Sequence, residues 1–145
     1  AQADHAAVSE HSEEGVVRVG HVVSKIRDVV QSALGFDRTA AGLESAIESL
    51  ESASILAESI HVDQSSLIAN TNLVEIARAQ ASARLTLATA QAALARNESR
   101  GCHHRNDFTD SNEDHLTHYT VDQMGDVKTL ALRKSKTGNW ILPPQ

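Results

Sequence analysis

The chain has 145 residues, and its 13 Lys and Arg side chains against 19 Asp and Glu give a formal net charge of −6. This length fits one domain of ordinary size, and the acidic balance excludes the basic surface that binding to nucleic acid or an anionic membrane would need. No apolar run approaches the ~20 residues of a membrane-spanning helix, and no apolar leader is visible. We therefore expect no nucleic acid partner, no membrane insertion and, with Cys102 as the single cysteine, a cytoplasmic location.

The first part of the chain predicts a helix. The sequence opens without Met in a polar, Ala-rich stretch, which suggests a piece of a longer polypeptide. Apolar residues then recur at spacings of three and four, which indicates one apolar stripe on a helix. The stripe comprises Val16, Val19, Val23, Ile26, Val30 and Ala33. Gly35 is expected to adopt the left-handed conformation that closes this helix.

A second helix is predicted after a short link, with Asp37 or Thr39 as its N-cap. Its apolar stripe comprises Leu43, Ile47, Leu50, Ser54 and Ala57, and its glutamates lie largely outside that stripe. Because the link is short, the first two helices should run antiparallel. Residues 59–70 have few periodic apolar positions and are expected to connect two helices.

The third predicted helix extends to Asn97 without Gly or Pro and is the longest, with Asn72 and Glu75 as a reciprocal cap at its start. One row on it reads Val74, Ala77, Ala81, Leu85, Ala88, Ala92 and Ala95, and a neighbouring row reads Leu73, Ile76, Ala83, Leu87, Ala90 and Leu94. Small side chains let a neighbouring backbone approach closely, so we expect this helix to be central in a three-helix bundle. Ala buries little area, at ~25 cal/mol per Å², and the bundle should be only modestly stable alone.

After Phe108 the sequence predicts a solvated loop and then a β-hairpin. Residues 115–121 and 127–132 are rich in β-branched or aromatic residues, and the Gly-containing stretch 122–126 has the length of a hairpin loop. Trp140 in the tail is expected to anchor onto the bundle or onto a body outside this chain. The predicted fold is mainly α, a three-helix bundle over residues 1–108 followed by a loop, a short C-terminal β-hairpin and a tail packed on the bundle over residues 109–145.

The densest polar run, residues 98–108, reads E-S-R-G-x-H-x-R-x-D-F directly after the Ala-rich helix. Its candidate site residues are Glu98, Arg100, Gly101, His103, Arg105 and Asp107. In one interpretation, opposite charges fix a tight turn around Gly101 and present donors to a neighbouring surface. In the other, cations stabilise the negative end of a helix that Gly101 terminates. The physics of these residues alone favours the second interpretation.

Other chemistry is weakly indicated. Zinc could be bound by Cys102, His103, His104, His115 and His118, but adjacent residues cannot easily all point at one metal, and two His three apart on a strand face opposite sides. Nucleophilic catalysis by Cys102 with a neighbouring His is equally weak. The seven glycines form no G-x-G-x-x-G motif, so the chain has no visible dinucleotide site. We predict no catalytic, cofactor-binding or metal-binding residue.

The segment from Asn97 to Phe108 resembles the start of the C-terminal region in the flavoprotein family of succinate dehydrogenase, fumarate reductase and L-aspartate oxidase. Cys102 after the Gly, together with the short tail, favours the L-aspartate oxidase branch. Thr109 departs from the Pro that commonly follows the aromatic residue in this family. The resemblance implies a C-terminal domain of an FAD-dependent enzyme that oxidises L-aspartate to iminoaspartate on the route to quinolinate and NAD.

The resemblance also implies a role for the candidate site residues. They would pack the helical domain against the flavin domain, as interface and structural positions. The implied partners are the upstream flavin-binding and capping domains of the same polypeptide, with quinolinate synthase as a candidate in the pathway. FAD would belong to the parent enzyme, and the fragment alone would bind none and be inactive. The alternatives are a flavoprotein subunit of succinate dehydrogenase or fumarate reductase, and a free-standing helical module that binds a partner helix.

Overall fold

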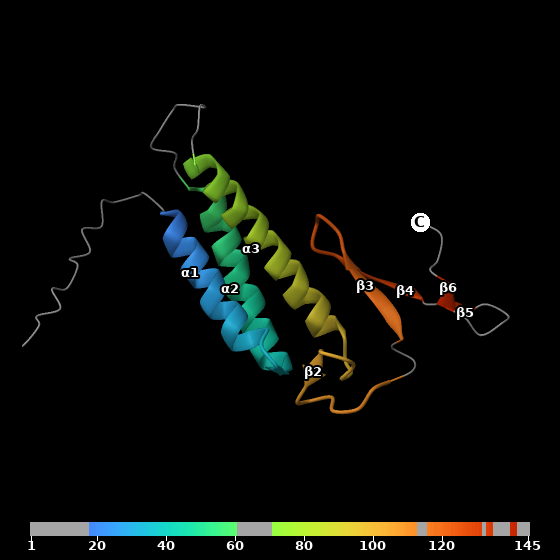
Figure 1. Cartoon of the computed structure of the whole chain (residues 1–145). Coiled ribbons are helices and arrows are strands. Elements are labelled where there is room, and N and C mark those ends of the chain that lie inside the picture. Colours follow the sequence, from blue (N-terminus) through green and yellow to red (C-terminus); the bar gives the residue numbers. More distant parts are fainter. Residues whose placement is uncertain (1–17, 61–70, 113–115, 132, 135–139, 142–145) are drawn as a thin grey trace, which may run out of the picture.

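The computed structural model describes residues 18–60, 71–112, 116–131, 133–134 and 140–141. Its helices are α1 (Val19–Ala33), α2 (Ala40–Glu58) and α3 (Thr71–Ala95). Figure 1 shows them side by side, with α2 antiparallel to both α1 and α3. The predicted fold, mainly helical with a strand pair after the third helix, is confirmed. Among the described residues, no helix is both long and apolar enough to cross a membrane.

Three short strand pairs accompany the helices. They are β1 (Asp37–Arg38) parallel to β2 (His104–Arg105), β3 (Thr117–Val121) antiparallel to β4 (Val127–Ala131), and β5 (Arg133–Lys134) antiparallel to β6 (Trp140–Ile141). The β3–β4 pair is the predicted hairpin, and Gly125 in its loop has a φ of +88°. The β1–β2 pair, which joins the first interhelical link to the segment after α3, was not predicted.

Helix α1 buries Val22 and Ile26, with the predicted Val19, Val23 and Val30 partly buried beside them. The predicted stripe did not include Val22, because it lay slightly to one side of the buried face of the helix. Val16 lies outside the described residues.

The end of α1 differs from the prediction. Positive φ angles occur at two of the described glycines, Gly101 and Gly125, and Gly35 is not left-handed. Arg38 closes the helix instead, since its guanidinium donates from Nη2 to the Leu34 carbonyl at 3.2 Å and from Nε to the Gly35 carbonyl at 3.1 Å. A side chain that satisfies the last carbonyls removes the need for a left-handed residue.

Thr39, one of the two predicted candidates, is the N-cap of α2, and its Oγ1 accepts a hydrogen bond from the Gly42 amide at 3.1 Å. Its buried residues are Leu43, Ala46, Leu50, Ala53 and Ala57. The predicted Ile47 and Ser54 lie half-buried at the edge of this stripe, and the predicted exposure of the glutamates is confirmed.

Helix α3 is the longest of the described helices, as predicted, but its limits and buried face differ. It begins at Thr71, so Asn72 lies inside the helix, and Glu75 accepts from Arg78 at 2.8 Å rather than capping. The first of the two predicted rows is not the buried face, since Val74 and Leu85 are 50% and 69% exposed. The buried residues are Ile76, Ala79, Ala83, Ala90 and Ala93, three of which belong to the second predicted row. A helix that is apolar nearly all round carries little information about which face is covered.

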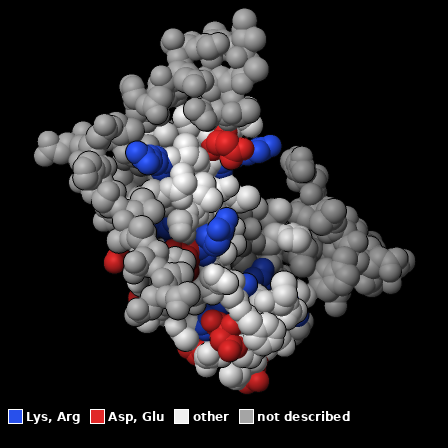
Figure 2. Space-filling model, turned by 60° about the vertical axis from the view of Figure 1, so that its left-hand side comes forward, with Lys and Arg blue, Asp and Glu red and all other residues white. Residues whose placement is uncertain are grey.

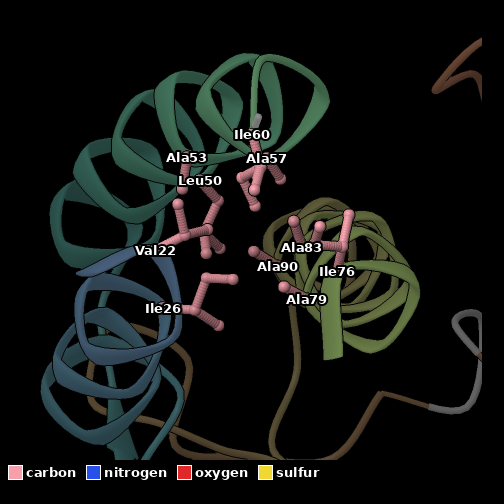
Figure 3. Packing of buried hydrophobic residues seen from close by; sticks show 10 residues of the cluster. All are labelled: Val22, Ile26, Leu50, Ala53, Ala57, Ile60, Ile76, Ala79, Ala83 and Ala90. Carbon is pink, nitrogen blue, oxygen red and sulfur yellow. The ribbon is translucent and has the colours of Figure 1, made fainter. Parts of the chain in front are cut away.

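The core lies where the three helices meet. In Figure 3, Val22 and Ile26 of α1 point between α2 and α3, toward Leu50 and Ala90. The rest of this aliphatic cluster consists of Ala53, Ala57, Ile60, Ile76, Ala79 and Ala83. Small side chains on α2 and α3 bring these two helices close together. The predictions for residues 61–70, for His115 and for the side chain of Trp140 fall outside the described residues.

Candidate functional site

The polar residues after α3 fold back against the α1–α2 link, beside β2 in Figure 1. We call this cluster the polar corner and define it as Arg38, Arg96, Glu98, Arg100, His103, Arg105 and Asp107. The turn predicted around Gly101 is present, with a φ of +59° at that residue. The backbones of Arg100 and His103 exchange hydrogen bonds of 2.8 and 3.0 Å across it.

Arg105 is the centre of the polar corner and is only 1% exposed. Its Nε and Nη2 donate to the two carboxylate oxygens of Asp107 at 2.7 and 2.6 Å, a bidentate pair. Its Nη1 donates to the carbonyls of Ala93 and Leu94 at 3.2 Å and lies 3.4 Å from that of Arg96. A cation thus satisfies the C-terminal carbonyls of α3, as the second interpretation of this segment predicted.

Asp107 connects this arrangement to the start of α2. Its Oδ2 accepts a hydrogen bond from the Ala40 amide at 2.9 Å, where a negative charge is favoured by the helix dipole. The hydrogen bonds from Arg105, aided by the Ala40 amide, hold the pKa of Asp107 well below its usual range despite partial burial. The charged pair therefore ties the end of α3 to the beginning of α2.

Glu98 is fully buried in this chain. Its Oε1 lies 2.5 Å from Nη1 of Arg96, and its Oε2 accepts from Nε of Arg100 at 3.1 Å and from the Asn112 amide at 2.9 Å. Burial alone raises the pKa of Glu98, but these three donors outweigh it and the net pKa is lowered. Glu98 is therefore a buried carboxylate whose charge is matched within the chain.

His103 joins the ends of α1 and α3. Its Nδ1 lies 2.7 Å from Nη1 of Arg38 and its Nε2 lies 3.3 Å from the Arg96 carbonyl. Because Arg can only donate, Nδ1 is the acceptor and the proton resides on Nε2. Burial, followed by the nearby Arg charges, lowers the pKa of His103, although the bond to the Arg96 carbonyl opposes this. The ring is thus neutral near pH 7.

The sequence analysis missed two members of the polar corner, Arg96 and Arg38. Arg38 binds His103, 65 residues away, as well as the carbonyls of Leu34 and Gly35 that follow α1. A local signal was available, because a cation four residues after Leu34 is well placed to stabilise a helix C-terminus. The partner His103 carries no such signal.

Arg96 connects the polar corner to the hairpin. Its Nη2 donates to the Thr117 carbonyl at 2.7 Å, and its guanidinium carbon lies 4.5 Å from the centre of the Tyr119 ring. This combines a charge-assisted hydrogen bond with a cation–π contact. The same side chain therefore contacts β3 and the buried carboxylate of Glu98.

The described sulfur and imidazole side chains do not converge. No three potential metal ligands lie together in the part of the chain that the structure describes. Cys102 is exposed, whereas His104 stacks on Phe36 with ring centres 5.7 Å apart and lies with Nδ1 3.3 Å from Asp37. Neighbouring His residues thus have different partners, which fits neither a metal site nor an activated thiol.

Neither the start of α2 nor the left-handed glycines offer a site for an FAD phosphate. A phosphate could be bound at a helix N-terminus, but the start of α2 is already capped by Thr39 and by the Asp107 carboxylate. The left-handed glycines, Gly101 and Gly125, lie in tight turns closed by backbone hydrogen bonds.

The candidate interface residues differ in their exposure, and therefore in whether a neighbouring domain could contact them directly. Glu98 and Arg105 are buried inside this chain, whereas the Arg100 side chain is 32% exposed and Gly101 is exposed. The buried residues can support a contact surface without touching its partner. On the face in Figure 2, acidic and basic side chains lie beside one another rather than in separate patches.

The fold and the polar corner define a helical domain that is closed by a charged turn. The chain belongs to the family described as fumarate reductase flavoprotein C-term, whose model matches residues 23–145. It is 32% identical over 116 residues to the succinate dehydrogenase flavoprotein subunit of Rickettsia bellii (strain RML369-C), and the match covers 78% of this chain and 20% of that protein.

Two solved structures have the same fold. One is a mutant of FrdA from E. coli quinol fumarate reductase, with a TM-score of 0.72 and 20% identity over 82% of this chain and 21% of that chain. The other is the Sdh1 complex of Mycobacterium smegmatis in the apo form, with a TM-score of 0.64 and 19% identity over 84% of this chain and 21% of the other. The chain thus spans about a fifth of the length of these proteins.

Proposed function

We propose that this chain is the C-terminal helical domain of an FAD-dependent L-aspartate oxidase. The observation that carries the proposal is the segment Glu98 to Phe108, whose sequence resembles this family and which folds into the polar corner within the matched region. In that enzyme L-aspartate gives up two electrons to FAD and becomes iminoaspartate, and oxygen or fumarate then reoxidises the flavin. Quinolinate synthase would use the product, in the cytoplasm.

The role of this chain in the enzyme is to pack against the flavin domain and stabilise it. The polar corner supports that role because its internal contacts fix the turn that carries Arg100 and Gly101. Arg100 donates to Glu98, and its backbone exchanges hydrogen bonds with that of His103. The loop, hairpin and tail of residues 109–145 would pack on the bundle as its second part. FAD and the catalytic residues would lie on the upstream flavin-binding and capping domains.

A second candidate is the flavoprotein subunit of succinate dehydrogenase or fumarate reductase. The observation that favours it is the 32% identity to the Rickettsia bellii succinate dehydrogenase subunit. Cys102 after the Gly favours the aspartate oxidase branch instead. A free-standing helical module has less support, because the relatives are about five times longer than this chain.

The substrates separate the two enzymes. The full-length polypeptide should be yellow, and anaerobic L-aspartate should bleach its flavin absorbance while succinate leaves it unchanged. Bleaching by succinate alone would establish the second candidate, and a colourless protein without either activity would overturn both. The 145-residue chain alone should show no flavin absorbance and no aspartate oxidation, and a yellow, active preparation of it would contradict the proposed division of roles.

A further inference from the structure

A hollow of about 890 Å³ lies between the hairpin tip and the adjoining faces of α2 and α3. We call it the hairpin groove and define it by Ala81, Leu85 and Ala88 of α3, Glu51 and Glu58 of α2, and Met124 at the hairpin tip. In Figure 1 the loop between β3 and β4 lies beside the middle of α3. The groove is on a different part of the bundle from the polar corner.

The groove exposes apolar surface on two sides. Leu85 on its floor is 69% exposed, and Met124 at the hairpin tip is 88% exposed. Single exposed apolar residues are ordinary, but two that line one concave surface are typical of an interaction site. The floor is also the α3 row of small residues that the sequence predicted to admit a close neighbour.

The hairpin tip beside the groove has a fixed backbone. Asp122 accepts hydrogen bonds at one carboxylate oxygen from the amides of Met124 and Asp126, at 2.9 and 3.0 Å. Gly125 approaches α3 so closely that an added Cβ would lie 3.3 Å from the side-chain nitrogen Nε2 of Gln91. The groove is therefore bounded by an ordered turn in contact with the helix.

The charge of the groove indicates what it would bind. Its lining includes the carboxylates of Glu51, Glu58 and Asp122 but a single Arg, Arg84. Arg84 pairs with Glu58, since its Nη2 lies 3.2 Å from that carboxylate, and Asp122 pairs with Nζ of Lys128 at 2.7 Å. Among the described residues Glu51 is the lining carboxylate without an ion pair. A partly apolar surface with a carboxylate at its edge is complementary to an apolar segment flanked by Lys or Arg.

We propose that the hairpin groove binds a segment of the same polypeptide from before residue 1, an apolar stretch flanked by Lys or Arg. This inference rests on the proposed function, in which the chain is one domain of a larger flavoprotein. Relatives in which this chain covers 20–21% of the length have about four fifths of their residues outside it. A body of that size needs a contact surface, and the groove is a partly apolar surface that the described helices and the hairpin leave open.

Photo-crosslinking in the full-length protein tests the contact. Leu85 is replaced by benzoylphenylalanine, and Ile55 is the matched control because it is 70% exposed on α2 and does not line the groove. After irradiation, peptides upstream of residue 1 should be crosslinked to position 85 at several times the yield found for position 55. Equal yields, or crosslinks from position 85 only to a second copy or to residues 1–17, would overturn the proposal.

A charge substitution provides a second test. Leu85→Glu in the full-length protein should at least halve the FAD that remains bound after gel filtration, because docking of an apolar segment would bury the new carboxylate without a partner, whereas Ile55→Glu should leave it unchanged. Equal loss in both variants would count against the groove. The yellow colour and substrate bleaching of the unmodified enzyme report on the proposed function separately, so a flavoenzyme without the crosslink overturns the groove alone.

Discussion

Arg38 and Arg105 are direct partners in the parallel β1–β2 pair, and each binds the C-terminal carbonyls of a different helix. Two cations can lie on neighbouring strands because each faces the negative end of a helix dipole. Arg38 also binds His103, and Arg105 also binds Asp107. The pair thus holds the ends of α1 and α3 together with the start of α2.

Replacing Arg105 by Met should destabilise the chain strongly. The guanidinium is 1% exposed and donates to the Ala93 carbonyl as well as to both carboxylate oxygens of the 31% exposed Asp107. Leaving a buried acceptor without its donor costs about 1–3 kcal/mol. Urea unfolding followed by circular dichroism at 222 nm measures the change.

The control for that change is Arg78→Met. Arg78 pairs with Glu75 at 2.8 Å, but these side chains are 70% and 53% exposed. An exposed pair of this kind contributes about 0.5 kcal/mol or less. Similar losses of unfolding free energy from Arg78→Met and Arg105→Met would show that burial of Arg105 does not make its contacts more stabilising than those of an exposed pair.

The free energy of unfolding should fall as the pH drops below about 6.5. The pKa of folded His103 is lowered, chiefly by burial, so in this range the unfolded chain binds a proton that the folded chain does not. The lowered pKa values of Glu98 and Asp107 add a second loss below about pH 4.5, where the unfolded carboxylates are protonated first.

His103→Gln separates the two pH ranges. A Gln amide can accept from Arg38 and donate to the Arg96 carbonyl without titrating. The variant should therefore lose less stability than the original chain between pH 7.5 and 5.5, and a similar amount below pH 4.5. Parallel curves of unfolding free energy over the upper range would show that His103 is not the responsible group.

The sequence predicted those parts of the fold that depend on local contrast. The stripe of α2 is readable because its exposed positions carry Glu, and the hairpin because a Gly-containing loop separates two β-branched runs. The buried face of α3 is not readable in this way, since Ala lies on every side of the helix. Only the positions of α1 and α2 decide that Ala83 is buried and Ala81 is exposed.

Local and distant contacts also differ in the polar corner. The turn at Gly101 and the presence of opposite charges around it are local and were predicted, although the Arg105–Asp107 pair was not named. The contacts of His103 with Arg38 and of Asp107 with the Ala40 amide join residues 65 and 67 positions apart. Such contacts arise only when β1 and β2 pair, and two-residue strands leave no pattern in a sequence.

Gly101→Ala and Gly20→Ala should have effects of opposite sign. Neither position has an atom within 4 Å of an added Cβ, but Gly101 has a φ of +59° whereas Gly20 lies in α1. An L-residue in the left-handed region costs about 1–2 kcal/mol, while Ala in place of Gly in a helix stabilises by about 0.5 kcal/mol or more. Thermal unfolding of both variants measures the difference, and a shift in the same direction would show that the left-handed turn is not required.

Arg96→Met should loosen the hairpin more than the bundle. The substitution removes the hydrogen bond to the Thr117 carbonyl and the contact with the Tyr119 ring, which hold β3 to the end of α3. An isolated two-stranded hairpin is marginally stable at best, so local opening should become about tenfold more frequent for a loss of ~1.4 kcal/mol. Hydrogen–deuterium exchange of the amides in residues 117–131 measures this.

The amides of α2 and the variant Tyr119→Leu serve as controls for that experiment. Tyr119→Leu removes the ring contact but keeps the hydrogen bond to Thr117, so it should accelerate hairpin exchange by a smaller factor. Arg96 also binds the buried Glu98 at 2.5 Å, but Arg100 and the Asn112 amide still donate to that carboxylate in the variant, which limits the loss in the bundle. Exchange in residues 117–131 should therefore rise by a larger factor than exchange in α2, and equal factors would mean that Arg96 acts through Glu98 rather than through the hairpin.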